Sequence, residues 1–172
     1  NGHIHHQRFE RGNIVTDLKV IGDTDETGTF IKFKADPEIF TETTVYEYEV
    51  LERRLREQAF LNAGIKITLS DLRDEPEKDD NGNARKDTLH FEGGIKSYVK
   101  RLNNGKEVLS DNIFYVDKQI GDVGVEIALQ YNDTYGETMK PFANNVLTPD
   151  GGMHVVGFRT GLTRTVNDYA RK

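Results

Sequence analysis

Short stretches in which apolar and polar residues alternate, the pattern of β-strands, recur along the chain. We expect strands over residues 3–10 and 29–35, the second of which begins after the Thr27-Gly28 break. Apolar alternation on both sides of the polar stretch 71–87 predicts a hairpin. Its tip is expected at Asn81-Gly82, because this pair adopts positive φ at low cost. The same pattern in the second half predicts strands over residues 113–116, 123–131 and 138–147.

A helical spacing of three and four replaces this alternation between residues 46 and 62. We expect Thr43 or Thr44 to cap the start of this helix, and the run Asn62-Ala63-Gly64 to end it. Its apolar face consists of Tyr48, Leu51, Leu55 and Ala59. The outer face is expected to carry i,i+4 ion pairs, which are Glu49 with Arg53 and Glu52 with Arg56.

Further helices are predicted after two Gly-Gly pairs. One follows Gly93-Gly94 and ends at Asn103-Asn104-Gly105, which supplies a helix stop. The other follows Gly151-Gly152 and collects apolar residues on one face, namely Val155, Phe158, Leu162, Val166 and Tyr169. The resulting order of strands, helix, hairpin, helix, sheet and helix is typical of an α+β protein.

Length and composition exclude several classes of protein. A length of 172 residues suggests one domain or two small pieces that pack together, and no apolar stretch is long enough for a membrane span, so no membrane partner is expected. The formal net charge of −6 has the wrong sign for a protein that simply coats nucleic acid, so any contact with DNA has to be local. The absence of cysteine excludes disulfides, cysteine-zinc sites and thiol nucleophiles, and it fits a cytoplasmic location.

The charge balance changes along the chain. Residues 1–92 contain 13 Lys and Arg against 20 Asp and Glu, a net charge of −7, whereas residues 93–172 contain 10 against 9, a net charge of +1. This shift indicates a boundary near Glu92-Gly93-Gly94, although the acidic run 74–80 supplies much of it.

The residues alone define no complete active site. The nucleophile-elbow, zinc-protease, Walker A and dinucleotide-binding motifs are all missing. His3 and His5 share a strand face, but no further ligand is placed by the sequence, so a polar face is favoured over a metal site. An EF-hand interpretation of residues 77–88 puts Thr88 where a bidentate Glu is required, and we reject it. The final helix carries basic residues that either meet phosphates or form a solvated face, namely Arg159, Arg164 and Arg171.

A series of ordered motifs extends over essentially the whole chain. They are DETGTFIKF (25–33), IFTETT (39–44), RRLREQAFLN (53–62), FEGGIKSYV (91–99), VEIALQY (125–131), FANN (142–145) and DGGMH (150–154). In this order they resemble the B subunit of bacterial DNA gyrase, a type IIA topoisomerase. The related topoisomerase IV B subunit is the near alternative, and the REQAFLN form of residues 56–62 looks more like gyrase.

The resemblance implies two domain parts. Residues 1–90 would be the C-terminal part of a GHKL (Bergerat) ATPase domain, an α/β sandwich. Residues 91–172 would be the first half of a transducer domain with the ribosomal-protein-S5 domain 2-like fold. The join would coincide with the charge shift and the Gly-Gly break.

The resemblance also implies a nucleotide contact. The Thr of the family's Thr-Gly-Thr strand, here Thr29, helps to bind adenine, and Ile31 forms the apolar pocket wall two residues on. The family's general base, its magnesium ligand and its phosphate-binding groups would all lie outside these residues. We therefore assign no catalytic and no metal-binding residue, and we expect this piece alone to be inactive although the whole subunit is an enzyme that uses ATP and Mg²⁺.

In the family, ATP binding dimerises two B subunits, and the transducer passes this closure to the DNA gate held with the gyrase A subunit. DNA, the A subunit and a second B subunit are thus the implied partners, and ATP-driven negative supercoiling is the implied activity. A non-enzymatic α+β binding module remains the alternative of a different class.

One position departs from the family. Met153 stands where the family has Thr in its Gly-Gly-Thr-His helix entry. Because Thr caps a helix and Met does not, we expect Met153→Thr to raise stability, by about 1 kcal/mol, unless Asp150 already serves as the cap.

Overall fold

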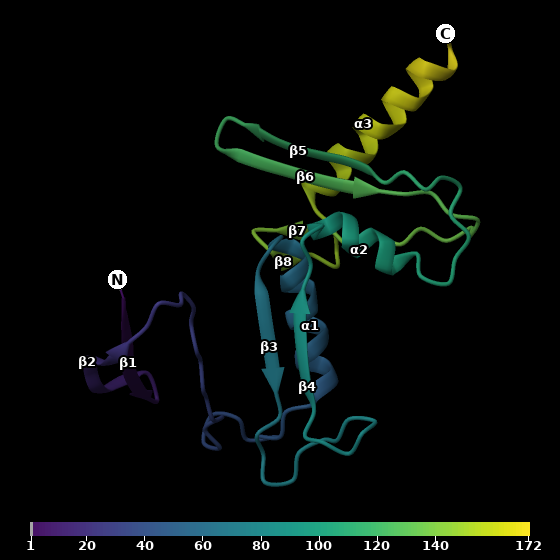
Figure 1. Cartoon of the computed structure of the whole chain (residues 1–172). Helices are drawn as coiled ribbons and strands as arrows, with labels where there is room; N and C mark the ends of the chain where they lie inside the picture. The colour runs from purple at the N-terminus through teal and green to yellow at the C-terminus, as the bar shows by residue number, and fades with distance from the viewer. Residues whose placement is uncertain (1) are drawn as a thin grey trace. The chain divides into compact units, whose positions relative to one another are not determined.

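The computed structural model describes residues 2–172. The chain divides into two compact units, Asn1–Tyr46 and Glu47–Lys172, and each is described by itself. The elements are short antiparallel pairs and three helices (Figure 1), which confirms the α+β class expected from the sequence. Within the described residues, no helix has both the length and the apolar character needed to cross a membrane.

The first unit is built on one hairpin. Strand β1, His3–Glu10, is confirmed, and it pairs antiparallel with β2, Asn13–Asp23. Strand β2 was not expected, because its apolar residues lie on both faces and give no clean alternation. The turn between the strands places Arg11 (φ 51°) and Gly12 (φ 80°) in the left-handed region.

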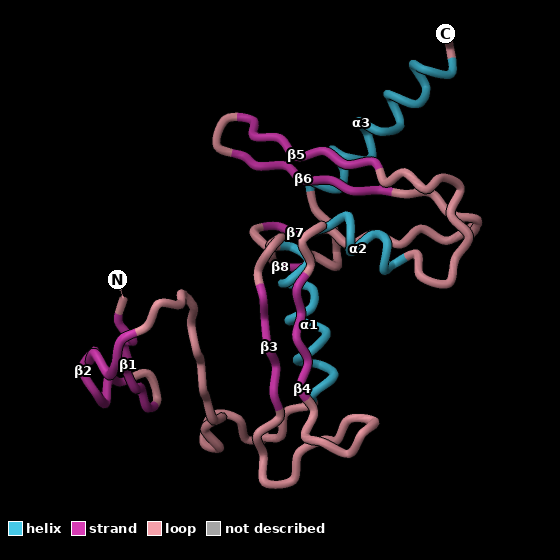
Figure 2. The backbone as a smooth tube through the Cα atoms, viewed as in Figure 1, coloured by secondary structure: helices cyan, strands magenta, loops and turns pink. Residues whose placement is uncertain are grey.

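The strand expected over residues 29–35 is absent. This stretch belongs to a long loop that follows β2 (Figure 2), and Phe30 is 85% exposed there. Apolar alternation favours an extended backbone, but a strand also needs a neighbouring strand with which to form a hydrogen-bonded ladder. No neighbour is in place here among the described residues, so the alternation produces an extended loop.

The core of the second unit lies between helix α1, Tyr48–Leu61, and a hairpin formed by β3, Lys66–Ser70, and β4, Lys86–His90 (Figure 1). Residues Lys66 and His90 are partners at one end of this ladder, and Ser70 and Lys86 at the other. Ala59 and Phe60 of α1 are fully or almost fully buried. The predicted hairpin and its Asn81-Gly82 turn are confirmed, with Gly82 at φ 81°.

Helix α1 follows its predicted path but not its predicted cap. Its last residue is Leu61 and Asn62 is its C-cap, as the predicted stop at Asn62-Ala63-Gly64 implies, whereas its N-cap is Glu47, which makes no side-chain cap hydrogen bond. Thr43 instead accepts a hydrogen bond from the backbone N–H of Val45, 3.1 Å away. A local threonine turn thus competes with the helix cap.

Only one of the two predicted ion pairs on α1 forms. Glu52 pairs with Arg56 as expected, but Glu49 pairs with Arg85 of the β3–β4 hairpin. Tertiary packing brings a second arginine within reach of Glu49, and helical spacing alone cannot reveal such a partner.

Helix α2, Gly94–Leu102, is confirmed and packs against both α1 and strand β6, Val123–Leu129. Strand β5, Phe114–Ile120, is longer than predicted, and it pairs with β6, Val123–Leu129. An aromatic stack links these parts: the ring of Phe60 lies 3.8 Å from that of Phe91 and 4.8 Å from that of Tyr98, between centroids.

The prediction of one continuous strand over residues 138–147 is wrong. The structure has instead a minimal hairpin of β7, Phe142–Ala143, and β8, Val146–Leu147. Asn144 and Asn145 form its turn with φ of 48° and 63°, the left-handed pair that a tight hairpin requires and that Asn tolerates.

Helix α3, Met153–Ala170, is confirmed, but none of its residues is buried. Its apolar face is therefore present and uncovered within the described chain. The residue before the helix is Gly152, and no side chain caps the first turn, so Asp150 does not serve as the cap.

Candidate functional site

The two residues expected to contact a nucleotide lie in the loop between β2 and α1 (Figure 2). Thr29 is exposed, and Ile31 has 76% of its surface exposed. Both are thus accessible to a ligand, and neither belongs to a strand. Their role in nucleotide binding stays a prediction.

The same loop is held at two points by contacts with the β1–β2 hairpin and its N-terminal flank. At its start, the backbone N–H of Thr24 donates to the carbonyl oxygen of Gly2 at 3.0 Å, next to the β1–β2 ladder. In its middle, Arg11 contacts the carboxylates of Asp36 and Glu38. Glu38, followed by Asp36, raises the pKa of the Arg11 guanidinium. The ring of Phe33 also packs edge-on against that of Tyr46, with centroids 5.2 Å apart.

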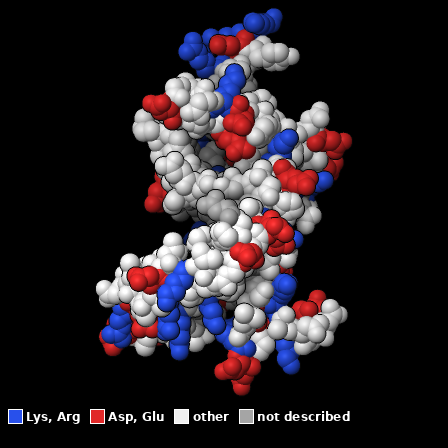
Figure 3. All heavy atoms as spheres, turned by 60° about the vertical axis from the view of Figure 1, so that its left-hand side comes forward, with Lys and Arg blue, Asp and Glu red and all other residues white. Residues whose placement is uncertain are grey.

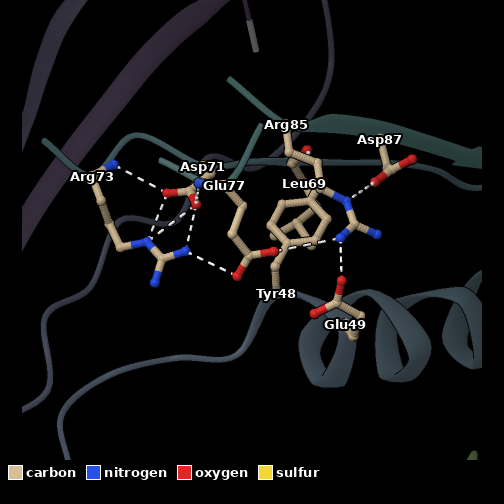
Figure 4. Close-up of polar contacts among 8 residues, drawn as sticks. All are labelled: Tyr48, Glu49, Leu69, Asp71, Arg73, Glu77, Arg85 and Asp87. Carbon is tan, nitrogen blue, oxygen red and sulfur yellow. Dashed lines mark hydrogen bonds and ion pairs between the residues drawn. The ribbon is translucent and has the colours of Figure 1, made fainter. Parts of the chain in front are cut away.

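The densest polar cluster of the second unit surrounds Asp71, whose side chain is only 3% exposed (Figure 4). The Nε of Arg73 lies 2.9 Å from one of its carboxylate oxygens and 3.1 Å from the other. The backbone N–H of Glu77 also donates to Asp71, at 2.9 Å. These donors, and above all the Arg73 guanidinium, hold the pKa of Asp71 well below its ordinary value.

Arg85 forms the second centre of this cluster (Figure 4). Its guanidinium lies over the ring of Tyr48, 4.2 Å from the centroid, and pairs with Glu49, with Glu77 at 3.4 Å and with Asp87 at 3.5 Å. The hydroxyl of Tyr48 donates to the carbonyl oxygen of Leu69, 3.1 Å away. Burial is the main cause that raises the pKa of Tyr48 to about 12.

In this Asp71–Arg85 cluster, four carboxylates share two arginines. Arginines face its carboxylates, and it joins the base of the long β3–β4 loop to the first turn of α1. Ion pairs of this kind are typical of a structural network, and we assign no catalytic acid or base to them. The sequence analysis did not identify the residues of this cluster. Arg85 and Glu49 come into contact only after the hairpin has formed, and their spacing along the chain does not indicate the contact.

Of the two candidate histidines, His3 has a structural partner. His3 Nδ1 lies 2.7 Å from a carboxylate oxygen of Asp23, across the β1–β2 hairpin. In residues 2–172 there is no group of three or more His, Cys, Asp or Glu side chains arranged to hold a metal ion.

The three arginines singled out on the final helix share a shallow groove. This groove on α3 has a volume of about 560 Å³ and is lined by Arg159, Arg164 and Arg171 together with neutral polar residues and Asp168. Figure 3 shows basic side chains gathered at the C-terminal end of α3, at the top of the view. Acidic neighbours reduce the positive charge, because Arg159 pairs with Glu137 at 2.6 Å and Arg164 lies 3.9 Å from Asp168. Phosphate contact here stays a prediction.

Comparisons with known proteins show which family the chain is similar to. A family model described as DNA gyrase B matches residues 94–172. The DNA gyrase B subunit of Staphylococcus epidermidis strain RP62A is 54% identical over 98% of the chain. The corresponding protein of Streptococcus pyogenes serotype M3, strain MGAS315, is 49% identical over the whole chain. The chain spans about a quarter of the length of these curated relatives, 25% in each case.

Solved structures agree with this. The 43K ATPase domain of Thermus thermophilus gyrase B, in complex with an aminocoumarin, superposes with a TM-score of 0.78 at 31% identity, over 99% of this chain and 44% of that one. The B subunit of Myxococcus xanthus gyrase shares the fold, with a TM-score of 0.77 at 22% identity, over 100% of this chain and 48% of that one. Homology over the full chain, together with a matching fold, shows that this chain belongs to the DNA gyrase B family.

Proposed function

We propose that this chain is a segment of the ATP-hydrolysing B subunit of DNA gyrase, which couples ATP binding and hydrolysis to double-strand DNA passage and negative supercoiling. The observation that carries the proposal is the 49–54% identity to DNA gyrase B subunits along essentially all of the chain. A topoisomerase IV B subunit is the second candidate, and the gyrase relatives favour the first. A non-enzymatic binding module has no observation in its favour.

Within this proposal, residues 1–90 complete a GHKL ATPase domain and residues 91–172 begin the transducer. The proposed join lies inside the second compact unit, where Phe60 stacks between Phe91 and Tyr98. Such a stack would let the two domain parts move as one body, because aromatic contacts add to the free energy of apolar burial. DNA, the gyrase A subunit and a second B subunit are the proposed partners, and the cytoplasm is the proposed location.

Thr29 and Ile31 are the proposed nucleotide contacts. The exposed hydroxyl of Thr29 is free to hydrogen-bond the adenine, directly or through water, and Ile31 offers an apolar wall. One neutral hydrogen bond contributes about 0.5–1.5 kcal/mol, so these residues refine nucleotide affinity and do not supply it alone. The described residues offer no set of ligands for Mg²⁺, and no catalytic step is assigned to them.

The test uses the whole B subunit that contains this segment, combined with the gyrase A subunit. The wild-type pair should introduce negative supercoils into relaxed plasmid only when ATP is present. Relaxation or decatenation without negative supercoiling would favour topoisomerase IV, and no ATP-dependent activity at all would overturn the enzyme proposal.

The nucleotide contact is tested by Thr29→Ala, with Thr27→Ala as the matched control in the same loop. Loss of one hydrogen bond should weaken ATP binding by about two- to twelvefold for Thr29→Ala. Equal affinities in Thr29→Ala, Thr27→Ala and wild type would remove Thr29 from the site. The 172-residue chain by itself is expected to show no ATP hydrolysis.

A further inference from the structure

The loop that carries Thr29 and Ile31 is restrained at two points within the described chain. Its residues form no ladder with a neighbouring strand in the described chain, and its large apolar side chains are exposed, among them Phe30, Ile31 and Phe33. A loop of this kind samples many conformations unless contacts at its ends define its path. The start is held by the Thr24 to Gly2 backbone hydrogen bond, and the stretch that follows residue 35 is held by a separate restraint.

Arg11 provides that restraint from the β1–β2 turn. Its Nε lies 2.6 Å from Asp36 Oδ2, and its Nη2 lies 2.7 Å from Glu38 Oε1. One guanidinium thus contacts two carboxylates through two nitrogens, a geometry that Arg achieves and a point charge such as Lys does not. The Asp36 Oδ2 atom is shielded from solvent and has no hydrogen-bond partner among the described residues, so its ion pair with Arg11 is the contact that compensates its charge.

Asp36 is itself part of a folded turn. Its other carboxylate oxygen accepts from the backbone N–H of Glu38 at 3.0 Å. Its carbonyl oxygen accepts from the N–H groups of Ile39 and Phe40, at 3.0 and 2.8 Å. Ala35, immediately before it, is buried. Residues 36–40, in the middle of the loop, therefore form a defined turn that contacts Arg11.

The backbone of Arg11 supports a role for its side chain. Its φ of 51° lies in the left-handed region, where Gly or Asn is less strained than Arg. A hairpin turn has no need of an arginine at such a position, so the reason for an arginine lies in what its side chain contacts.

We propose that Arg11 is a positioning residue of the nucleotide site: by holding Asp36 and Glu38 it sets the path of the loop from which Thr29 and Ile31 meet the nucleotide. This inference rests on the proposed function. It assigns Arg11 no contact with the nucleotide, only with the loop's own carboxylates.

Arg11→Asn is the most direct variant, made in the whole B subunit. Asn tolerates the positive φ, so the substitution removes the guanidinium without adding backbone strain. The matched control is Arg8→Gln on the same hairpin, because Arg8 pairs with Glu10 and, among the described residues, with no carboxylate of the loop. The KM for ATP should rise about three- to tenfold in Arg11→Asn, with kcat within about twofold of wild type. The loss of binding free energy cannot exceed the free energy that the contacts between Arg11 and the loop contribute. Arg8→Gln should change neither quantity.

A double-mutant cycle separates positioning from a general loss of stability. If Arg11 acts through Thr29, the effects of Arg11→Asn and Thr29→Ala on ATP affinity will be less than additive. Arg11→Lys should restore only part of the affinity, because it keeps the charge but not the two-nitrogen contact. Glu38→Gln breaks one of the two pairs at an exposed carboxylate, so it is the alternative variant if Arg11→Asn fails to fold, and it should give a smaller rise in KM.

The outcomes distinguish the two proposals. An unchanged KM in Arg11→Asn, or in Glu38→Gln where the first variant does not fold, would overturn the positioning role while Thr29→Ala still weakens binding. Fully additive effects in the cycle would overturn it as well. A wild-type subunit that binds no ATP would instead remove the proposed function, whatever the Arg11 variants do.

Discussion

The side chain of Gln58 on α1 donates a hydrogen bond to the backbone carbonyl of Asn145 at 3.0 Å, across 87 positions of sequence. Asn145 in turn donates through Nδ2 to the side-chain oxygen of Asn62, 3.1 Å away. The end of α1 therefore holds the β7–β8 turn at its left-handed residue. This contact joins residues that the family resemblance assigns to different domain parts.

Substitutions at Asn145 should separate backbone strain from the hydrogen bond. Asn145→Gly relieves the positive φ and loses only the bond to Asn62, whereas Asn145→Ala loses the bond and adds strain. We expect Asn145→Ala to be the less stable variant by about 1 kcal/mol. Urea unfolding of the chain measures the difference, and equal stabilities would show that the turn is not strained.

Asp71 should make the stability of the second unit depend on acid pH. Arg73 lowers the pKa of the folded Asp71 below the ordinary 3.8, so its contribution is present above that value and is lost as the pH falls through the folded pKa. Asp71→Asn should reduce stability at neutral pH and flatten the acid decline between about pH 4 and pH 2.

Unfolding by urea at several pH values measures this effect. The control is Asp74→Asn, an exposed carboxylate in the same loop, for which the wild-type decline should persist. An acid decline of equal steepness in Asp71→Asn and wild type would contradict the role given to the Arg73 pair.

Two tyrosines should ionise late in an alkaline titration. Burial, helped by Glu57, raises the pKa of Tyr98 to about 12, and burial is also the main cause at Tyr48, again to about 12. A raised folded pKa means that the stabilisation is complete below the unfolded value of 10.0 and disappears as the pH rises towards 12. Phenolate absorbance should show a late phase that shrinks in Tyr98→Phe and shrinks further in Tyr48→Phe/Tyr98→Phe.

Tyr98→Phe also tests the buried hydrogen bond to Glu57. The Tyr98 hydroxyl lies 3.3 Å from the Glu57 carboxylate, and the phenyl ring of the variant can keep the stack with Phe60. We expect a loss of about 0.5–1.5 kcal/mol at neutral pH, because only the hydrogen bond is removed. A Tyr98→Phe variant that is more stable than wild type would mean that burying the Glu57 charge costs more free energy than the hydrogen bond contributes.

A serine at the N-cap of α3 should destabilise the protein, against the usual preference. Gly152 occupies this position with φ 148°, and a Cβ there would lie 2.9 Å from the ring of His154. We expect Gly152→Ser to lower the melting temperature, although Ser is a favoured N-cap.

The structure revises the expectation for Met153→Thr. Met153 is the first helical residue, one position after the N-cap, so a Thr there does not occupy the capping position. Its side chain is also 82% exposed. The substitution should change stability by less than about 0.5 kcal/mol, and a clear gain in melting temperature would restore the capping account.

Local signals in the sequence were sufficient for the helices and for one hairpin. Helices α1, α2 and α3 and the β3–β4 hairpin follow from apolar spacing and from Gly and Asn stops, which act through neighbouring backbone. The family also followed from the ordered motifs alone, since the curated relatives match along the whole chain.

The tertiary structure determined which extended stretches became strands and which charged side chains formed ion pairs. Residues 29–35 alternate but have no neighbour in the described chain, while β2 lacks clean alternation and forms because β1 is next to it. Arg11 with Asp36, and Arg85 with Glu49, are pairs between segments that only folding brings together. The physical reason is that a helix satisfies its backbone hydrogen bonds internally, whereas strands and ion pairs need partners supplied by distant sequence.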